Sequence, residues 1–137
     1  EAVYRDFLSL RNALEPEAAA LAAMNATAQQ RIQLSATFQR MDDISKDFNV
    51  ETWTEADLEF HRLIFLSTGN SFYLPFANVL CTMFKSFITH SSIQGSTCIN
   101  EHRAIYSAIM AGDSDKARQA NIDLLSKSKR RLPNSKK

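Results

Sequence analysis

Apolar residues recur at spacings of three and four along the first segment of the chain, from Val3 to Met24, and form one stripe. They are Phe7, Leu10, Leu14, Ala18, Leu21 and Ala22. This spacing matches the helical repeat of roughly 3.6 residues and predicts an amphipathic helix. Because a proline cannot donate a backbone hydrogen bond, Pro16 predicts a kink or a restart of this helix near Glu15.

Polar caps and a glycine stop mark the next two helices. Thr27, with Gln30 three residues later, predicts a capping box at the start of the second helix. Thr54 is the expected N-cap of the third helix, although the three residues before it could belong to the start of that helix. Gly69 and Asn70 predict its end.

The fourth helix carries apolar residues on almost every side. Ser71 is expected to open it, and Pro75 is tolerated because it falls in the first turn. The apolar residues are Leu74, Val79, Leu80, Met83, Phe84, Phe87 and Ile88. A helix of this kind is buried on more than one side, so we expect it in the core or in a subunit interface.

Two further helices complete the chain. One is expected to end at Gly112, and the other to be capped by Asp113 and to end near Leu132, just before a proline. Six helices with short connections predict an all-α antiparallel bundle. We divide the chain into a helical domain of 1–132 and a basic C-terminal tail of 133–137.

Composition excludes several other classes of protein. The 137 residues suit one domain, and three Gly and three Pro are too few for a β-rich fold. A net charge of +1 is too small to indicate a nucleic-acid-binding domain. No apolar stretch reaches the roughly 18 residues of a membrane span. Two cysteines fit a reducing cytoplasm. Because the chain begins with Glu rather than Met, we expect an excised fragment.

One pair of residues suggests metal chemistry. Asp57 and His61 lie four residues apart in the third helix, which places both on one face. His102, in another helix, could supply a third ligand, and such a set suits zinc or nickel. A structural role remains the alternative, because this spacing arises often by chance. Motifs of nucleophilic or phosphate-transfer enzymes are absent from the sequence, so we do not expect an enzyme.

Three stretches in order resemble a known family. They are Arg11-Asn12-Ala13-Leu14-Glu15-Pro16 with Ala20-Leu21-Ala22-Ala23; Asp57-Leu58-Glu59-Phe60-His61 with Thr68-Gly69-Asn70; and Glu101-His102-Arg103-Ala104-Ile105 with Ala108-Ile109, Gly112-Asp113, Ala117 and Ala120. Together they resemble the FCD domain, the effector-binding domain of FadR-type GntR-family bacterial transcription regulators. The resemblance implies six or seven helices around a cavity, here without the N-terminal winged helix-turn-helix domain through which such regulators bind DNA.

The resemblance also implies a metal site. Many members of the family bind a divalent metal through one Asp and three His, and Asp57, His61 and His102 match three of these ligands. Leu124 stands where the third His is expected, and a leucine cannot be a ligand. Three ligands could still hold zinc or nickel with an open position. The alternative is that the three side chains hydrogen-bond a polar effector directly.

The family senses small carboxylic acids, including sugar acids, and three basic or hydroxyl residues are assigned to the effector. Arg11 lies beside the expected cavity and could bind a carboxylate in bidentate fashion, unless it pairs with Glu15 one turn away. Ser128 and Arg131 lie three residues apart in the last helix, in an ending similar to that of some regulators of sugar-acid (galactonate-type) catabolism.

The resemblance therefore predicts a cytoplasmic ligand-sensing and dimerisation domain. A small organic or sugar acid would bind the bundle, and the first and fourth helices would form the homodimer face. Two alternatives remain. One is a ligand-free helical dimerisation module, which Leu124 favours. The other is a metal-dependent hydrolase, for which Glu59 and Glu101 are the acids nearest in sequence, each turned away from the ligands on its helix.

Overall fold

The computed structural model describes residues 2–91 and 97–129, with the side chains of 80, 84, 86–91, 128 and 129 outside that description. The described residues form six helices and no strand, which confirms the all-α prediction. The helices are α1 (Ala2–Asn25), α2 (Ala28–Lys46), α3 (Val50–Leu66), α4 (Tyr73–Ser91), α5 (Ile99–Met110) and α6 (Ser114–Lys129). None of these helices is both long enough and apolar enough to cross a membrane.

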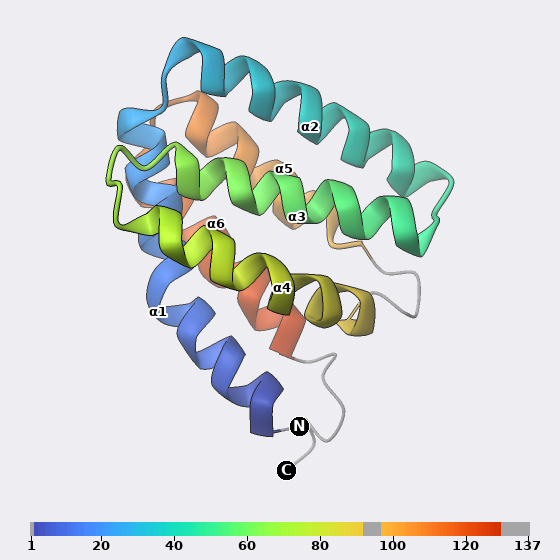
Figure 1. Ribbon diagram of the computed structural model, residues 1–137. Helices are drawn as coiled ribbons and strands as arrows, with labels where there is room; N and C mark the ends of the chain where they lie inside the picture. The colour runs from blue at the N-terminus through green and yellow to red at the C-terminus, as the bar shows by residue number, and fades with distance from the viewer. Residues whose placement is uncertain (1, 92–96, 130–137) are drawn as a thin grey trace.

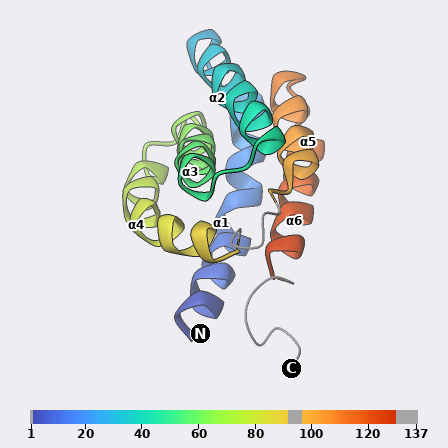
Figure 2. The ribbon, with the colours of Figure 1, turned by 90° about the vertical axis from the view of Figure 1, so that its right-hand side faces the viewer.

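Helix α1 contacts α3, α4, α5 and α6 and runs down the left side of the domain in Figure 1. Figure 2 shows α3 and α4 on one side of α1, and α5 and α6 on the other side. Helix α2 packs against both α3 and α5 at the upper end of the domain in Figure 1. Because α1 packs against both α3 and α5, the arrangement brings together the three helices that carry Arg11, Asp57, His61 and His102.

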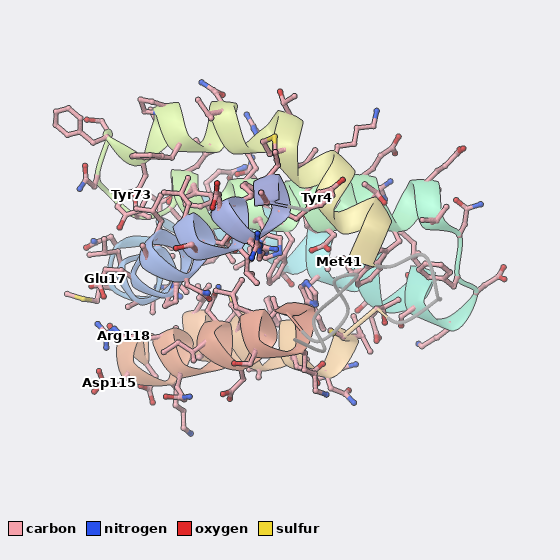
Figure 3. The ribbon with its side chains drawn as sticks, turned by 90° about the horizontal axis from the view of Figure 1, so that it is seen from below. Tyr4, Glu17, Met41, Tyr73, Asp115 and Arg118 are labelled. Carbon is pink, nitrogen blue, oxygen red and sulfur yellow. The ribbon has the colours of Figure 1, made fainter. Side chains whose placement is uncertain are left out.

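Alanine allows α1 and α6 to approach closely. The buried alanines of α1 are Ala18, Ala19, Ala20, Ala22 and Ala23. Ala117 and Ala120 are buried on α6. Because small side chains shorten the distance between helix axes, α1 and α6 make the most extensive helix contact of the described residues. Arg118 adds an ion pair with Glu17 across this contact and a second pair with Asp115 on its own helix, as Figure 3 shows.

Two helix boundaries differ from those expected. Of the kink or restart expected near Glu15, the restart does not occur, because helix α1 continues through Pro16 as one helix. Pro16 is buried in the core, and this packing outweighs the single lost hydrogen bond. Helix α3 begins at residue 50, and its N-cap is Asn49, whose side chain accepts two backbone N–H groups. Thr54 is instead inside the helix, where its hydroxyl donates to the carbonyl of Val50 at 2.7 Å.

The other predicted caps are confirmed. Thr27 and Gln30 form the capping box of α2. Gly69 and Gly112 have φ angles of +73° and +71°, in the left-handed region that ends helices. Asp113 accepts a hydrogen bond from the third residue of α6.

Arg31 joins the ends of two helices that carry site residues. Its guanidinium donates to the carbonyl oxygens of Ala23 and Ala26 at the end of α1. It also donates to the carbonyl of Ile109 near the end of α5. A cation is favourable at both helix C-termini, so Arg31 fixes α5 relative to α1.

The outer face of α4 is apolar and exposed. The helix begins at Tyr73, two residues later than the expected start at Ser71. Phe76 and Val79 are 38% and 62% exposed, and their spacing of three places them on one face of the helix. Phe72, in the turn before the helix, is 79% exposed. Figure 3 shows side chains of α4 projecting away from the bundle. We expected this helix either in the core or in a subunit interface. The core position is wrong for this exposed face, and the interface stays a prediction.

Candidate metal and effector site

Asp57 is the centre of a buried polar cluster. Its Oδ1 atom lies 3.0 Å from Nε2 of His61 and 2.9 Å from Nε2 of His102. Asp57 and His61 are one turn apart on α3, whereas His102 comes from α5. The three residues are only 6%, 2% and 3% exposed. The fold therefore brings together, in the interior, the three residues that the sequence nominated as ligands.

The backbone of Cys98 orients the His102 ring. Cys98 precedes α5 with a φ of 51°, in the left-handed region that residues other than glycine seldom adopt. Its carbonyl accepts the backbone N–H of His102 at 3.1 Å and lies 2.8 Å from Nδ1 of the same residue. Because a carbonyl can only accept, Nδ1 carries a proton. Nε2 is then the atom that meets Asp57.

Arg11 and Glu15 form a second buried charged pair, on α1. Nε and Nη2 of Arg11 donate to the two carboxylate oxygens of Glu15 at 2.5 and 3.2 Å. Oε1 of Glu15 is also 3.4 Å from Nδ1 of His61. The Glu15 carboxylate thus lies beside Nδ1 of His61, whereas Asp57 lies beside Nε2. A carboxylate often occupies this position next to a metal-binding histidine and orients its ring. Arg11, nominated for an effector carboxylate, already has a carboxylate of the protein beside it.

The cluster favours charges on Asp57 and His102. Burial alone would raise the pKa of the Asp57 carboxyl, but the charges and hydrogen bonds of His102 and His61 hold that pKa far below its ordinary value. Burial alone would lower the pKa of His102, but the charge and hydrogen bond of Asp57, aided by the Cys98 carbonyl, raise it. Arg11 partly opposes this rise. A metal ion would therefore have to displace a proton from Nε2 of His102.

Aromatic rings surround the two histidines. The ring centroid of Trp53 lies 5.6 Å from that of His102, with the ring planes at 88°. Phe60 is 5.4 Å from the ring of His102 and 5.6 Å from the ring of His61. Trp53 and Phe60 are fully buried. Apolar surroundings of this kind exclude water from the charged groups and strengthen the electrostatic interactions between them.

The donor atoms present fit a divalent ion. One ligand atom from each of Asp57, His61 and His102 lies within 4.8 Å of the other two. Two imidazole nitrogens and a carboxylate oxygen suit zinc or nickel. Leu124 is buried on α6 and offers no ligand atom. The described residues therefore match a three-ligand site with an open position rather than a closed structural site.

Four other residues were nominated from the sequence. Arg131 and the side chain of Ser128 fall outside the described residues, so their role in effector binding stays a prediction. Glu59 pairs with Arg62 at 3.3 Å, and Glu101 pairs with a lysine. Each of these acids is thus paired with a basic side chain that is about half exposed.

Sequence reasoning missed two residues of the cluster. Glu15 was considered only as an alternative partner of Arg11, although its spacing of four from Arg11 placed it on the same helix face. Trp53 precedes Asp57 by four residues and therefore shares its face of α3, which was the available signal. Neither signal indicates which neighbouring helix that face meets.

The sequence model of the FCD domain matches residues 6–127, a range that includes the whole Asp57 cluster. This chain belongs to the FCD domain family. The resemblance deduced from the ordered motifs is thereby confirmed. The FCD domain is found in GntR-family transcription regulators, and the curated relatives of this chain are regulators of that kind.

Three relatives come from Escherichia coli K12. An uncharacterized HTH-type transcriptional regulator, YieP, is 32% identical over 119 residues, which cover 87% of this chain and 52% of the relative. The galactonate operon transcriptional repressor is 26% identical over 127 residues, covering 90% and 55%. A putative L-lactate dehydrogenase operon regulatory protein is 30% identical over 128 residues, covering 88% and 48%. The chain thus spans about half the length of these relatives.

A solved structure has the same fold. A GntR protein of Streptococcus agalactiae superposes with a TM-score of 0.83 at 23% identity, over 96% of this chain and 60% of that protein. At this identity the likeness concerns the fold, and it agrees with the helical bundle described above.

Proposed function

We propose that this FCD domain is the sensor of a transcription regulator and binds a small organic or sugar acid at the Asp57 cluster. The observation that carries the proposal is the convergence of Asp57, His61 and His102 in the interior of an FCD domain, with Arg11 and Glu15 adjoining them. Ionisable groups are rarely gathered in a protein core without a functional reason. The role is binding, not catalysis.

Burial of the cluster supports a sensing role. Because Asp57, His61 and His102 are all less than 10% exposed, we infer that the helices around them move when an acid binds. A ligand that binds one arrangement of helices better than another shifts the equilibrium between the two. Binding at this place is therefore coupled to the shape of the bundle, which an attached DNA-binding domain could detect.

Charge balance supports the participation of a cation. Asp57 and Glu15 are acidic, and Arg11 and the protonated His102 are basic, so these four groups together carry no net positive charge. An anionic acid is not attracted to such a site unless a cation joins it. Zinc or nickel, held by Asp57, His61 and His102, would supply positive charge and an open position for an oxygen of the acid.

The first experiment is a thermal-unfolding screen of the 137-residue chain. L-Lactate, galactonate and succinate are each added with zinc, with nickel or with EDTA. We expect at least one acid to raise the transition temperature in the presence of metal. An acid at about one hundred times its Kd should stabilise the fold by about 2.7 kcal/mol. EDTA should abolish this effect.

Matched compounds and a variant serve as controls. Lactamide and galactose lack the carboxylate and should leave the transition unchanged. His61→Ala should lose the response to acid and bind less than one equivalent of metal. The proposal fails if no acid shifts the transition under any of the three metal conditions.

A ligand-free dimerisation module is the alternative function. It is favoured by the mutual pairing of the buried polar groups, since Arg11 already binds Glu15 and Asp57 already accepts from both histidines. Leu124, which removes a ligand, also favours it. This alternative predicts that neither metal nor acid affects the thermal transition.

We also propose that the exposed face of α4 binds a second copy of the chain. Regulators of this family act as dimers. Phe72, Phe76 and Val79 form the apolar stripe that such a contact would bury. In a two-fold dimer the same stripe comes from both copies, so an apolar surface is matched by an identical apolar surface.

Val79→Glu should weaken this dimer at least about tenfold, because each copy would bury an unpaired carboxylate at the contact. Light scattering coupled to size-exclusion chromatography, over a range of concentrations, measures the change. Asn78→Glu is the matched control, since the exposed Asn78 lies about 100° around the same helix. A wild-type chain that is monomeric throughout, or equal effects of both variants, would contradict the assignment.

A further inference from the structure

We propose that the indole N–H of Trp53 is a hydrogen-bond donor for the bound acid and makes the site selective for acids that carry an additional oxygen. This inference rests on the proposed function of the Asp57 cluster and adds the class of ligand. Trp53 lies fully inside the protein, with an exposed fraction of 0%.

Trp53 has a buried polar atom that the protein does not satisfy. Among the described residues, its Nε1 atom has no hydrogen-bond partner. Leaving a buried donor unpaired is costly, and most buried tryptophans find an acceptor. Only one other buried side-chain atom in the described part of the chain shares this condition, Oδ1 of Asn121 on α6. An unpaired donor that persists in a core is reasonably explained by a partner that comes from outside the chain.

The indole lies against the proposed site. Its ring meets the ring of His102 edge to face, with centroids 5.6 Å apart. Trp53 is also one helical turn before Asp57, on the same face of α3. A ligand that interacts with His102 and Asp57 would therefore come close to the indole. Among the described residues, no acceptor of the cluster lies within hydrogen-bond distance of this N–H.

The chemistry of the indole N–H defines the ligand class. It is a donor and never an acceptor. It therefore selects a carboxylate, hydroxyl or carbonyl oxygen and is not satisfied by an alkyl group or an ammonium. A 2-hydroxy acid can offer one oxygen toward the histidine side and another to Trp53. The corresponding acid without the hydroxyl cannot make the second contact. A site discriminates strongly against a ligand that leaves one of its buried polar groups unpaired. We infer that L-lactate or galactonate binds better than propionate.

Trp53 is the only tryptophan of the chain, which makes the test direct. With nitrogen-15 tryptophan the protein shows one indole N–H signal. Zinc-loaded protein is titrated with L-lactate, with galactonate and with propionate. We expect either hydroxylated acid to move the indole proton to lower field and slow its exchange with solvent, and propionate to do so less.

Affinity is measured on two variants that remove the donor. Trp53→Phe keeps an aromatic ring. Replacement of Trp53 by benzothienylalanine, in which sulfur stands in place of N–H, keeps the ring shape if the phenylalanine variant folds poorly. Both should bind the hydroxylated acid about tenfold more weakly while propionate binding is unchanged. Tyr106→Phe is the control, since it removes a hydroxyl that bonds Ser35 at 3.0 Å, outside the cluster.

Different outcomes separate this inference from the proposed function. If no acid binds the wild-type chain, the proposed function fails and this inference fails with it. If an acid binds but the indole signal is unchanged and the variants bind equally well, only the inference fails. An indole proton whose chemical shift and exchange rate do not respond to a bound acid would also overturn the inference.

Discussion

Asp57→Asn is expected to lower the free energy of unfolding of the chain by about 3–5 kcal/mol in EDTA near pH 6, the range seen when one partner of a buried ion pair is removed. Asparagine preserves the shape of the side chain but not its charge. His102 then loses the carboxylate that raises its pKa, and the oxygen that meets Nε2 of His61 loses its negative charge. Zinc binding, measured by calorimetry, should be lost as well.

The pH dependence of stability gives this prediction a second signature. The pKa of Asp57 is lowered by folding, so its contribution is present above the ordinary pKa of 3.8 and is lost as the pH falls toward the folded value. The pKa of His102 is raised, so its contribution is complete below the ordinary pKa of 6.5 and is lost as the pH rises through the folded value. The chain in EDTA should therefore be most stable between these two limits, and Asp57→Asn should flatten both slopes.

Urea unfolding between pH 3 and pH 9 provides the measurement, on a scale where a pKa shift of one unit corresponds to about 1.4 kcal/mol. Asp123→Asn is the control, because Asp123 is exposed on α6 and bonds Gln119 on the same helix. A loss of stability no larger for Asp57→Asn than for Asp123→Asn would refute the central role assigned to Asp57.

Glu15→Gln should cost a similar amount, about 3–5 kcal/mol, because it leaves the Arg11 guanidinium buried without a countercharge. The side chains of Arg11 and Glu15 are only 3% and 2% exposed, so solvent does not compensate for the loss. Glu59→Gln is the matched control. Glu59 has an arginine partner at a spacing of three, but the pair is exposed, so its loss should cost about 1 kcal/mol or less.

The double variant Arg11→Met with Glu15→Leu tests what the pair is for. Replacing a buried ion pair by apolar side chains of similar size is often nearly neutral, so most of the stability should return. If Arg11 contributes to acid binding, this stable variant will no longer respond to the acid that stabilises the wild type. A full response would show that Arg11 serves only to hold Glu15, and a double variant as unstable as Glu15→Gln would contradict the pairing argument.

The helices could be predicted from the sequence because their signals are local. The apolar stripe of α1, the Thr27 capping box and the glycine stops depend on residues a few positions apart. The errors also have local causes. Thr54 and Asn49 are both good N-caps, and the sequence does not say which of them has extended backbone angles. Pro16 is a helix breaker by its chemistry, but its burial in the core overrides that tendency.

The candidate site was predictable only in part. Asp57 and His61 share a helix, so their spacing of four was enough to pair them. His102 was named as a possible third ligand because it is a histidine on another predicted helix. The ordered family motifs then supported this choice, and the match to the FCD domain confirms the family. The roles of Ser128 and Arg131 stay predictions. The exposure of α4 could not be read from the sequence, because an apolar helix looks the same in a core and in an interface.

By itself, then, the sequence determined the six helices, the FCD family and the three residues that offer metal ligands. The tertiary structure decided what surrounds them. It placed Glu15 behind His61, set the Cys98 carbonyl against His102 and buried the Trp53 N–H without an acceptor. These contacts lie across helices or depend on an unusual backbone angle. Helical periodicity shows which residues share a face, but only the packing of that face against its neighbours decides which atoms meet.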